Sequence, residues 1–345
     1  MKSGVGKLLV FFCLIAASAA ALQKLIDHGM RQVQVSDIGA LNRVMSGKVN
    51  ARIVINGSSR AMSHYDPDVI REATGESAFN LGRNGSQIDI QLAVLEAYLR
   101  HNAAPEVVIQ NLDHFSFLTT HELYDPGRYI PYLNERELYK TVQEINPEAW
   151  KWKYLPLYGY AVEDMRMTWF LGFRQAIGLG PKPEGNLLGY VPRDASWNGD
   201  FAAFVAEHPD GVKVDIEPKG VADLEAMVAI CQSKGVQLIL VYSPEYVPMQ
   251  KLVTNRREIF GKFEAIAKQA GVPLWDYSGS EISHNQALFS NSQHLNRQGA
   301  EAFSQDLAGR LAGYLKARAA LATRTGLTGE AMTETISNPE VNRAR

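Results

Sequence analysis

The alternation of short apolar runs with helical patterns constrains this fold more than any other feature of the sequence. Runs rich in Val, Ile and Leu recur along the chain, and stretches with apolar residues at helical spacing separate them. This alternation is typical of parallel strands joined by crossover helices. The sequence predicts strands at 51–56, 78–81, 106–111, 236–242 and 272–275, and helices at 66–74, 87–100, 221–233, 255–270 and 296–322. The predicted fold class is therefore α/β, a flavodoxin-like three-layer sandwich with a parallel five-stranded sheet.

The segment from 119 to 214 interrupts this alternation and is rich in aromatic residues, which include Trp150, Trp152, Tyr154, Tyr158, Tyr160, Trp169, Phe170 and Phe173. We expect an inserted helical cap at 119–214 within an α/β domain formed by 45–118 and 215–322. The cap could be a small subdomain with its own core, or a lid that faces a substrate or a membrane. Residues 323–345 lack apolar periodicity, and their Thr-, Glu- and Asn-rich composition predicts a disordered tail.

The N-terminus carries an export signal. Lys2 and Lys7 precede an uncharged apolar run from Leu8 to Leu22, which is short for a membrane-spanning helix, and the small residues at 17–19 suit a cleavage site. Residues 1–25 are therefore a signal peptide or an N-terminal membrane anchor, and we favour the anchor because the helix can continue to Ile26. The predicted location is the periplasm or the extracytoplasmic face of the inner membrane, with secretion if the signal is cleaved.

Charge and cysteine content exclude several classes of protein. The chain has 35 basic and 37 acidic residues, so no basic field attracts nucleic acid. Cys13 lies in the apolar run, which leaves Cys231 alone in the folded part and excludes an intramolecular disulfide there. We expect Cys231 to be a small core residue. The histidines show no metal-ligand spacing, so we predict neither a metal site nor a cofactor.

A Gly-Ser-Ser turn follows the first predicted strand, and Ser59 is its last residue. A nucleophilic serine needs such a place, at a strand end where backbone N–H groups can receive an oxyanion. Gly-Ser-Ser turns are also common in ordinary loops. Arg60 and Arg83 are predicted either to line the mouth of this site and bind an anionic group, or to be ordinary solvated side chains.

Three further segments fall where a parallel sheet gathers reactive groups, at the carboxyl ends of its strands. Gly85 follows the second strand and opens a helix, and glycine lets a backbone N–H approach a bound oxygen. Asn111 ends the third strand with a carboxamide that can donate to the same oxygen. His294 stands just before the last helix, in the run NSQHLNRQGA at 291–300.

The order and spacing of these segments resemble those of the SGNH, or GDSL-type, hydrolase superfamily, in its exported, envelope-associated branch. The resemblance covers residues 50–118 and 218–318, and the continuation His-Leu-Asn-x-x-Gly-Ala from His294 is its most specific match. It implies that Ser59 is the nucleophile and His294 the general base. It also implies an oxyanion hole formed by the Ser59 N–H, Gly85 and Asn111.

One position departs from the family pattern, because Asn291 stands where the family has aspartate. A carboxylate there holds the imidazole tautomer and stabilises the imidazolium, and its replacement by Asn in a serine protease triad costs about 10⁴ in turnover. The loss would be smaller if the Asn291 carbonyl oxygen faced the His294 ring, or if Asp276 or Asp113 reached it. We therefore expect either a working Ser–His pair or an impaired site that only binds.

The resemblance implies two alternative functions. The first is an exported serine esterase or O-acyltransferase that acts on ester-linked acyl groups, acetyl above all, of exopolysaccharide or another cell-surface glycan. The second is a catalytically impaired protein of the same fold that serves as a polysaccharide-binding or assembly factor. The expected partners are an acylated glycan or polysaccharide, envelope polysaccharide-assembly proteins, and the membrane if the N-terminal segment is uncleaved.

Overall fold

The sheet has the predicted topology. The computed structural model describes residues 2–161, 166–183 and 188–325. Its five strands all run parallel in the order β2-β1-β3-β4-β5. They are β1 (Ile53–Asn56), β2 (Ala78–Asn80), β3 (Val107–Leu112), β4 (Gln237–Tyr242) and β5 (Leu274–Asp276). The fold class predicted from the sequence, an α/β three-layer sandwich of the flavodoxin type, is confirmed.

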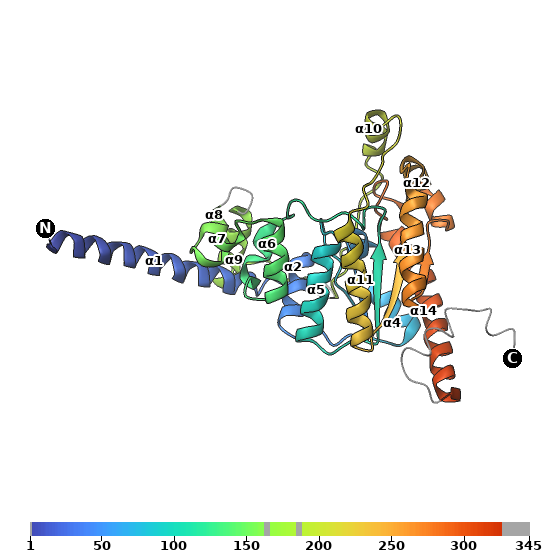
Figure 1. Cartoon of the computed structure of the whole chain (residues 1–345), viewed down its shortest axis with the longest axis horizontal. Coiled ribbons are helices and arrows are strands. Elements are labelled where there is room, and N and C mark those ends of the chain that lie inside the picture. The colour runs from blue at the N-terminus through green and yellow to red at the C-terminus, as the bar shows by residue number, and fades with distance from the viewer. Residues whose placement is uncertain (1, 162–165, 184–187, 326–345) are drawn as a thin grey trace.

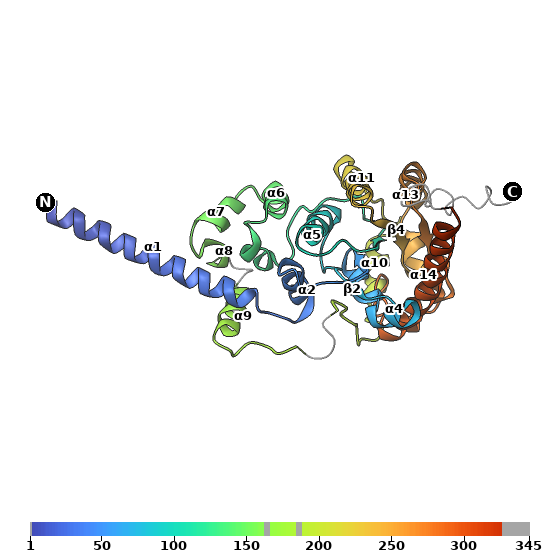
Figure 2. The same cartoon turned by 90° about the horizontal axis from the view of Figure 1, so that it is seen from below.

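Helices cover both faces of this sheet because alternate strand residues point in opposite directions. Val54, Val108 and Leu238 belong to one core, and Ile55, Ile109 and Ile239 belong to the other. The first core is covered by α5 (Ile88–His101), α11 (Pro218–Ser233) and α13 (Arg256–Ala270), and the second by α3 (Ser59–His64), α4 (Pro67–Thr74) and α14 (Arg297–Thr325). Figure 2 shows α11 and α13 on one side of β4, and α4 and α14 on the other.

Nearly uninterrupted apolar strands are expected for a sheet buried on both faces. All residues of β1, β3 and β4 are buried, including the polar Gln110 and Asn111 at the carboxyl end of β3. Cys231 lies on α11 with no exposed surface, as predicted, and burial raises the pKa of its thiol to about 12. The predicted tail lies outside the described residues from 326 onward, whereas 323–325 still belong to α14.

The described residues of the insertion form five α-helices, and their apolar side chains share a core with the N-terminal helices. Its helices are α6 (Arg136–Ile145), α7 (Ala149–Tyr154), α8 (Tyr158–Ala161), α9 (Arg166–Ala176) and α10 (Asp200–Glu207). Leu138, Trp152 and Tyr160 of the insertion pack in one cluster with Ile26 of α1 (Lys2–Met30) and Leu41 of α2 (Ser36–Met45). The insertion and the N-terminal helices therefore form one structural unit beside the sheet.

Helix α1 has two parts with different surroundings. From Val5 to Leu25 its large apolar side chains are exposed, whereas Ile26 and Met30 are buried against the insertion. Among the described residues, α1 is the one helix long and apolar enough to cross a membrane. Figure 1 shows it leaving the body as an extended rod beside α7, α8 and α9. An exposed apolar helix whose C-terminal end packs against the folded domain is consistent with the predicted signal peptide or membrane anchor.

Helices α1 and α9 approach closely because glycines lie between them. A methyl group added to Gly172 on α9 would lie 2.8 Å from the Ile26 backbone oxygen and 2.6 Å from the Met30 side chain. Neither distance is compatible with an ordinary contact, and one of the two neighbours is backbone. The root of α1 is thus held by a packing surface that a single methyl group disturbs.

Replacing Gly172 by Ala should lower the free energy of unfolding by about 1–3 kcal/mol, the usual cost of overpacking. The matched control is Gly261→Ala in the middle of α13, where an added methyl has nothing within 4 Å. It should raise the free energy of unfolding by about 0.5–1 kcal/mol, because alanine is the better helix former. Urea unfolding of the full chain in detergent, followed by circular dichroism, measures both. Equal effects of the two substitutions would contradict the packing account.

Candidate active site

Ser59 is positioned by a tight turn at the end of β1. Gly57 adopts a φ of 147°, and a methyl group there would lie 2.8 Å from Ala61 Cβ and 2.9 Å from Asn111 Cβ. The position therefore requires glycine for both its backbone angle and its close packing. Ser58 follows as the N-cap of α3, with its Oγ accepting from the Arg60 N–H. Ser59 thus begins α3 at the carboxyl edge of the sheet and is partly exposed.

His294 reaches Ser59 from the loop that precedes α14. Its Nε2 lies 2.8 Å from the Ser59 Oγ, although 235 residues separate the two in the sequence. The loop is held by His64 at the far end of α3, whose Nε2 accepts a hydrogen bond from the Leu295 N–H at 3.0 Å. The two segments that carry Ser59 and His294 are therefore tied together by a second contact beside the first.

Asn291 presents its carbonyl oxygen to His294. The Asn291 Oδ1 accepts the backbone N–H groups of Gln293 and His294 at 3.0 and 2.9 Å, and it lies 3.0 Å from His294 Nδ1. Because backbone N–H groups only donate, they require oxygen rather than nitrogen at this position. The same oxygen then accepts a hydrogen bond from the Nδ1–H group, which leaves Nε2 unprotonated and free to accept a hydrogen bond from the Ser59 hydroxyl. Neither Asp276 nor Asp113 takes this place, since their carboxylates bind Ser278 N–H and Arg60 instead.

The surroundings of His294 favour its neutral form. Burial, followed by the nearby cations of Arg193 and Arg60, lowers the pKa of His294 from 6.5 to about 3. Burial and Arg60 likewise hold the pKa of His64 well below its usual value. A neutral imidazole with a free Nε2 lone pair is the form that can remove a proton from a serine hydroxyl. Asn291 supplies no charge to stabilise the imidazolium, and the Glu245 carboxylate raises the pKa of His294 less than burial and the two cations lower it.

The expectation that Arg60 lines the mouth of the site is wrong. Arg60 is fully buried, forms an ion pair with Asp113 at 3.0 Å, and donates to the Ser243 carbonyl oxygen at 2.6 Å. Successive helical residues are turned by about 100°, so the helix that exposes Ser59 directs Arg60 into the protein. Arg60 therefore braces the strand ends and acts on His294 through its charge.

Arg83 is also buried, contrary to expectation. It has 2% of its surface exposed and lies with its guanidinium 5.9 Å from the centre of the Tyr129 ring. Burial lowers the pKa of this guanidinium. The insertion covers Arg83 through Tyr129, and neither this contact nor the burial follows from the local sequence.

The three expected oxyanion donors differ in availability. The backbone N–H groups of Ser59 and Gly85 have no hydrogen-bond acceptor within the described part of the chain. The Asn111 carboxamide, in contrast, is fully buried and donates to Asp113 Oδ1 at 3.0 Å and to the Leu112 carbonyl oxygen at 3.3 Å. Its own Oδ1 accepts from Tyr65. The expectation that Asn111 donates to an oxyanion is therefore not met in this structure.

The end of the insertion brings Arg193 to the site. The Val191 N–H donates to the Met62 carbonyl oxygen on α3, and the Arg297 N–H donates to the Arg193 carbonyl oxygen, both at 3.0 Å. The segment is thus bound on one side to the helix of Ser59 and on the other to the loop of His294. Arg193 Nε is buried without a partner, and no carboxylate pairs with its guanidinium among the described residues. Arg193 is a partly buried cation beside a neutral histidine.

Tyr124 is a second side chain that the insertion adds to this region. It packs over Gly85, where an added methyl would come within 2.5 Å of the Tyr124 Cβ. Gly85 has a φ of 62°, which glycine adopts without strain. Half of the Tyr124 surface is exposed, so the ring forms part of the surface around Gly85.

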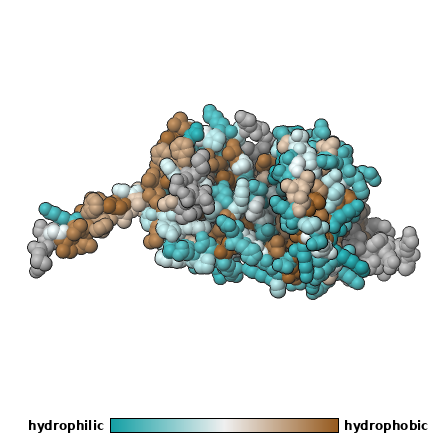
Figure 3. Space-filling view, turned by 90° about the horizontal axis from the view of Figure 1, so that it is seen from above, coloured by the Kyte–Doolittle hydropathy of each residue, from teal (hydrophilic) through white to brown (hydrophobic). Residues whose placement is uncertain are grey.

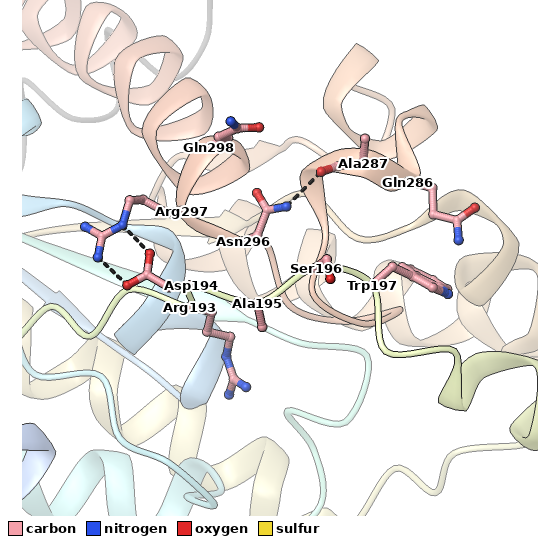
Figure 4. Close-up of a pocket in the computed structure, with 10 residues that line it drawn as sticks. All are labelled: Arg193, Asp194, Ala195, Ser196, Trp197, Gln286, Ala287, Asn296, Arg297 and Gln298. Carbon is pink, nitrogen blue, oxygen red and sulfur yellow. Dashed lines mark hydrogen bonds and ion pairs between the residues drawn. The ribbon is translucent and has the colours of Figure 1, made fainter.

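An open cleft of about 840 Å³ lies beside Arg193, and Ser59 is not among the residues that line it. Its walls are the insertion segment 193–197 and two segments near His294, at 286–287 and 296–298. Figure 4 shows Arg193 and Trp197 toward the two ends of the insertion segment, with Gln286, Asn296 and Gln298 across from it. The Trp197 ring is held in place by Tyr246, with ring centres 5.0 Å apart. The cleft thus combines the Trp197 indole, several carboxamides, the Arg193 guanidinium and the Arg297–Asp194 ion pair.

The sequence did not single out Arg193, Tyr124 or Trp197, because all three lie in the insertion without a recognisable motif. His64, one of the histidines without metal-ligand spacing, accepts the Leu295 N–H and so holds the loop that carries His294. Among the residues that the structure describes, no group of three or more His, Cys, Asp and Glu side chains is arranged to hold a metal ion.

Comparisons with known proteins add little to this geometry. No protein-family model matches the sequence, and no curated protein matches it either. One solved structure with some likeness is that of a protein from Bacteroides fragilis provisionally described as an acylhydrolase. It shares 12% sequence identity and a TM-score of 0.33, over 76% of this chain and 88% of that one. At that distance the likeness carries no argument about this chain, whose site is described from its own residues.

The rate at which Ser59 reacts should fall on acidification only well below pH 6.5, because the pKa of His294 is lowered to about 3. We call this fall the acidic limb of the pH–rate profile. Only neutral His294 accepts the Ser59 proton, so raising this pKa moves the limb to higher pH. Replacing Arg193 by Gln removes one of the cations that lower it and should shift the limb upward. The rate of labelling by a fluorophosphonate, measured from pH 3 to 8, gives the limb. Arg257→Gln, at an exposed position on α13, is the control and should leave the limb in place. An unshifted limb in the Arg193 variant contradicts the electrostatic account.

Proposed function

We propose that this chain is a serine acyl-ester hydrolase or O-acyltransferase with Ser59 as its nucleophile and His294 as its general base. The observation that carries the proposal is the 2.8 Å hydrogen bond between Ser59 Oγ and His294 Nε2, with Asn291 Oδ1 on the other ring nitrogen. An ordered serine, histidine and orienting acceptor is the arrangement that nucleophilic acyl transfer needs. Asn291 is therefore a positioning residue that sets the tautomer of His294.

In the first half of the proposed reaction, Ser59 Oγ attacks the ester carbonyl carbon while its proton passes to His294 Nε2. The carbonyl oxygen becomes an oxyanion, which the free N–H groups of Ser59 and Gly85 are available to bind. The carbon–oxygen bond to the alcohol then breaks, and His294 returns the proton to the leaving oxygen. The product is an acyl ester on Ser59.

In the second half, a hydroxyl group attacks the acyl carbon and gives its proton to His294. The oxyanion forms again, the bond to Ser59 Oγ breaks, and His294 returns the proton to that oxygen. Water as the attacking molecule makes the protein an esterase, and a sugar hydroxyl makes it a transferase. Both outcomes use the same residues and the same proton balance.

The cleft beside His294 supports a glycan as the substrate. Aromatic faces stack on sugar rings, and Trp197 lies in this cleft near Gln286, with the carboxamides of Asn296 and Gln298 farther along its lining. The Arg193 guanidinium suits a negatively charged group such as the carboxylate of an acidic sugar. We therefore propose an acylated exopolysaccharide or other cell-surface glycan, acetylated above all, with envelope polysaccharide-assembly proteins as partners. The apolar rod of α1 supports a position on the extracytoplasmic side of a membrane.

A second candidate, a polysaccharide-binding or assembly factor without turnover, is favoured by Asn291 and Asn111. Asn291 gives His294 an acceptor but no negative charge, and the Asn111 carboxamide is already bound to internal acceptors. Both features weaken stabilisation of the transition state while they leave the cleft intact. The two candidates differ in whether Ser59 reacts.

Labelling with a fluorophosphonate decides between them. The reagent should attach to Ser59, because His294 Nε2 is in place to take the serine proton as fluoride leaves. Ser59→Ala should abolish labelling, and Ser63→Ala, on the same helix with its Oγ bound to the Ser59 carbonyl oxygen, should retain it. An unlabelled wild-type chain, or equal labelling of the Ser59 variant, would exclude the enzyme.

Replacing Asn291 by Asp should raise ester hydrolysis by one or more orders of magnitude, up to the roughly 10⁴ that the converse change costs in a serine protease. The carboxylate would stabilise the imidazolium, so the acidic limb should also move to higher pH. Turnover of p-nitrophenyl acetate measures both effects. Asn285→Asp, at an exposed position in the preceding loop, is the matched control and should change neither. No activity in both wild type and Asn291→Asp would favour the binding factor.

A further inference from the structure

The apolar part of α1 joins the folded body without a linker. Exposed large apolar residues extend to Leu22 and recur at Leu25, with Gln23 and Lys24 between them, and full burial against the insertion begins at Ile26. The uncharged run from Leu8 to Leu22 is about 22 Å long at 1.5 Å per residue, and the Lys7 and Lys24 side chains that flank it can extend to the headgroups at the two faces of a hydrocarbon core roughly 30 Å thick. A bilayer crossed by this stretch ends where the protein body begins. The surface of the body around the root of α1 must therefore lie at the headgroup layer.

That surface carries an exposed aromatic patch. We define the α7–α9 patch by six residues, each with between 36% and 63% of its surface exposed, which are Trp150, Tyr154, Leu155, Tyr158, Trp169 and Phe170. Large apolar side chains at this density are unusual on a surface that faces only water. Figure 3 shows hydrophobic residues gathered at the end of the body from which α1 leaves.

Hydrogen bonds place the patch at the depth where α1 enters the body. The Leu157 N–H donates to Gln23 Oε1 at 2.7 Å, and the Tyr160 hydroxyl donates to Asp27 Oδ1 at 2.6 Å. Leu157 lies between Leu155 and Tyr158, so this part of the patch is level with Gln23. Gln23 itself stands just before the last exposed apolar residue of α1, Leu25.

Two lysines lie among the aromatic rings. Lys151 Nζ is 5.5 Å from the centre of the Tyr158 ring, and Lys153 Nζ is 5.5 Å from that of Tyr154. Lys151 is ion-paired with Glu148, whereas Lys153 has no carboxylate partner among the described residues. Tryptophan, tyrosine and lysine together are typical of the membrane–water interface, where rings lie at the headgroup level and ammonium groups meet phosphates.

We propose that the α7–α9 patch is a membrane-binding surface that lies in the headgroup layer of the phospholipid bilayer crossed by α1. The two contacts act together, since α1 fixes the distance of the body from the bilayer and the patch fixes its tilt. The candidate active site is thereby held in one orientation relative to the membrane. This inference needs the uncleaved chain and is independent of the chemistry at Ser59.

The test uses tryptophan fluorescence of the full chain in phosphatidylcholine nanodiscs, with and without lipids brominated at carbons 6 and 7. Residues 1–30 contain no tryptophan, so quenching by bromine reports the body and not α1. Of the five tryptophans, Trp150 and Trp169 belong to the patch, and Trp197 lies in the cleft beside the candidate active site. We expect the brominated lipid to quench the wild-type chain, and Trp150→Phe/Trp169→Phe to lose most of that quenching.

Trp197→Phe is the matched control, and because it removes a tryptophan that the lipid does not reach, the quenched fraction of its fluorescence should equal or exceed that of the wild-type chain. Circular dichroism of each variant shows whether the fold is retained. Absence of quenching in the wild-type chain, or quenching that survives replacement of both patch tryptophans in a folded protein, would overturn the proposal. Neither result would touch the assignment of Ser59 and His294, which fluorophosphonate labelling tests separately.

Discussion

The hydrogen bond between Ser59 and His294 is the contact on which the candidate site depends. The topology of the parallel sheet brings the two residues together. Ser59 follows β1 near the start of the domain, and His294 follows β5 near its end. In a parallel sheet all carboxyl strand ends lie on one edge, so residues far apart in the sequence meet there. The His64–Leu295 contact and the insertion segment at 191–198 then hold the two sides of the pair together. The site therefore depends on the sheet topology and on these two further ties.

Electrostatics at this site differ from those of a triad with a carboxylate. Backbone N–H groups orient Asn291 so that its oxygen meets His294, which preserves the tautomer without supplying charge. Burial and the cations of Arg193 and Arg60 keep the imidazole neutral. A neutral base accepts a proton readily only if the resulting cation is stabilised, and here the stabilising Glu245 carboxylate is outweighed by burial and the two cations. The site thus stabilises the neutral Ser59–His294 pair more than the imidazolium that forms when His294 takes the serine proton.

The insertion links the site to the N-terminal helix. Its last segment carries Arg193 and Trp197 to the cleft, and its helices share a core with α1 and α2. The same structural unit thus contacts the candidate site at one end and the root of the apolar rod at the other. The insertion, which has no family motif, is therefore the part of the chain that joins the candidate site to α1.

Local patterns in the sequence determined the five strands, the helices between them, the fold class, and the placement of Ser59 at a strand end and of His294 just before the last helix. These features depend on apolar periodicity and on turn residues within a few positions, which the sequence displays directly. Only the tertiary structure decided that Arg60 and Arg83 are buried, that the Asn111 carboxamide is occupied, and that Arg193 stands beside His294. It also decided that the insertion shares its core with α1. These outcomes depend on which distant segments pack together, and no short stretch of sequence encodes the direction of a side chain or the partner that covers it.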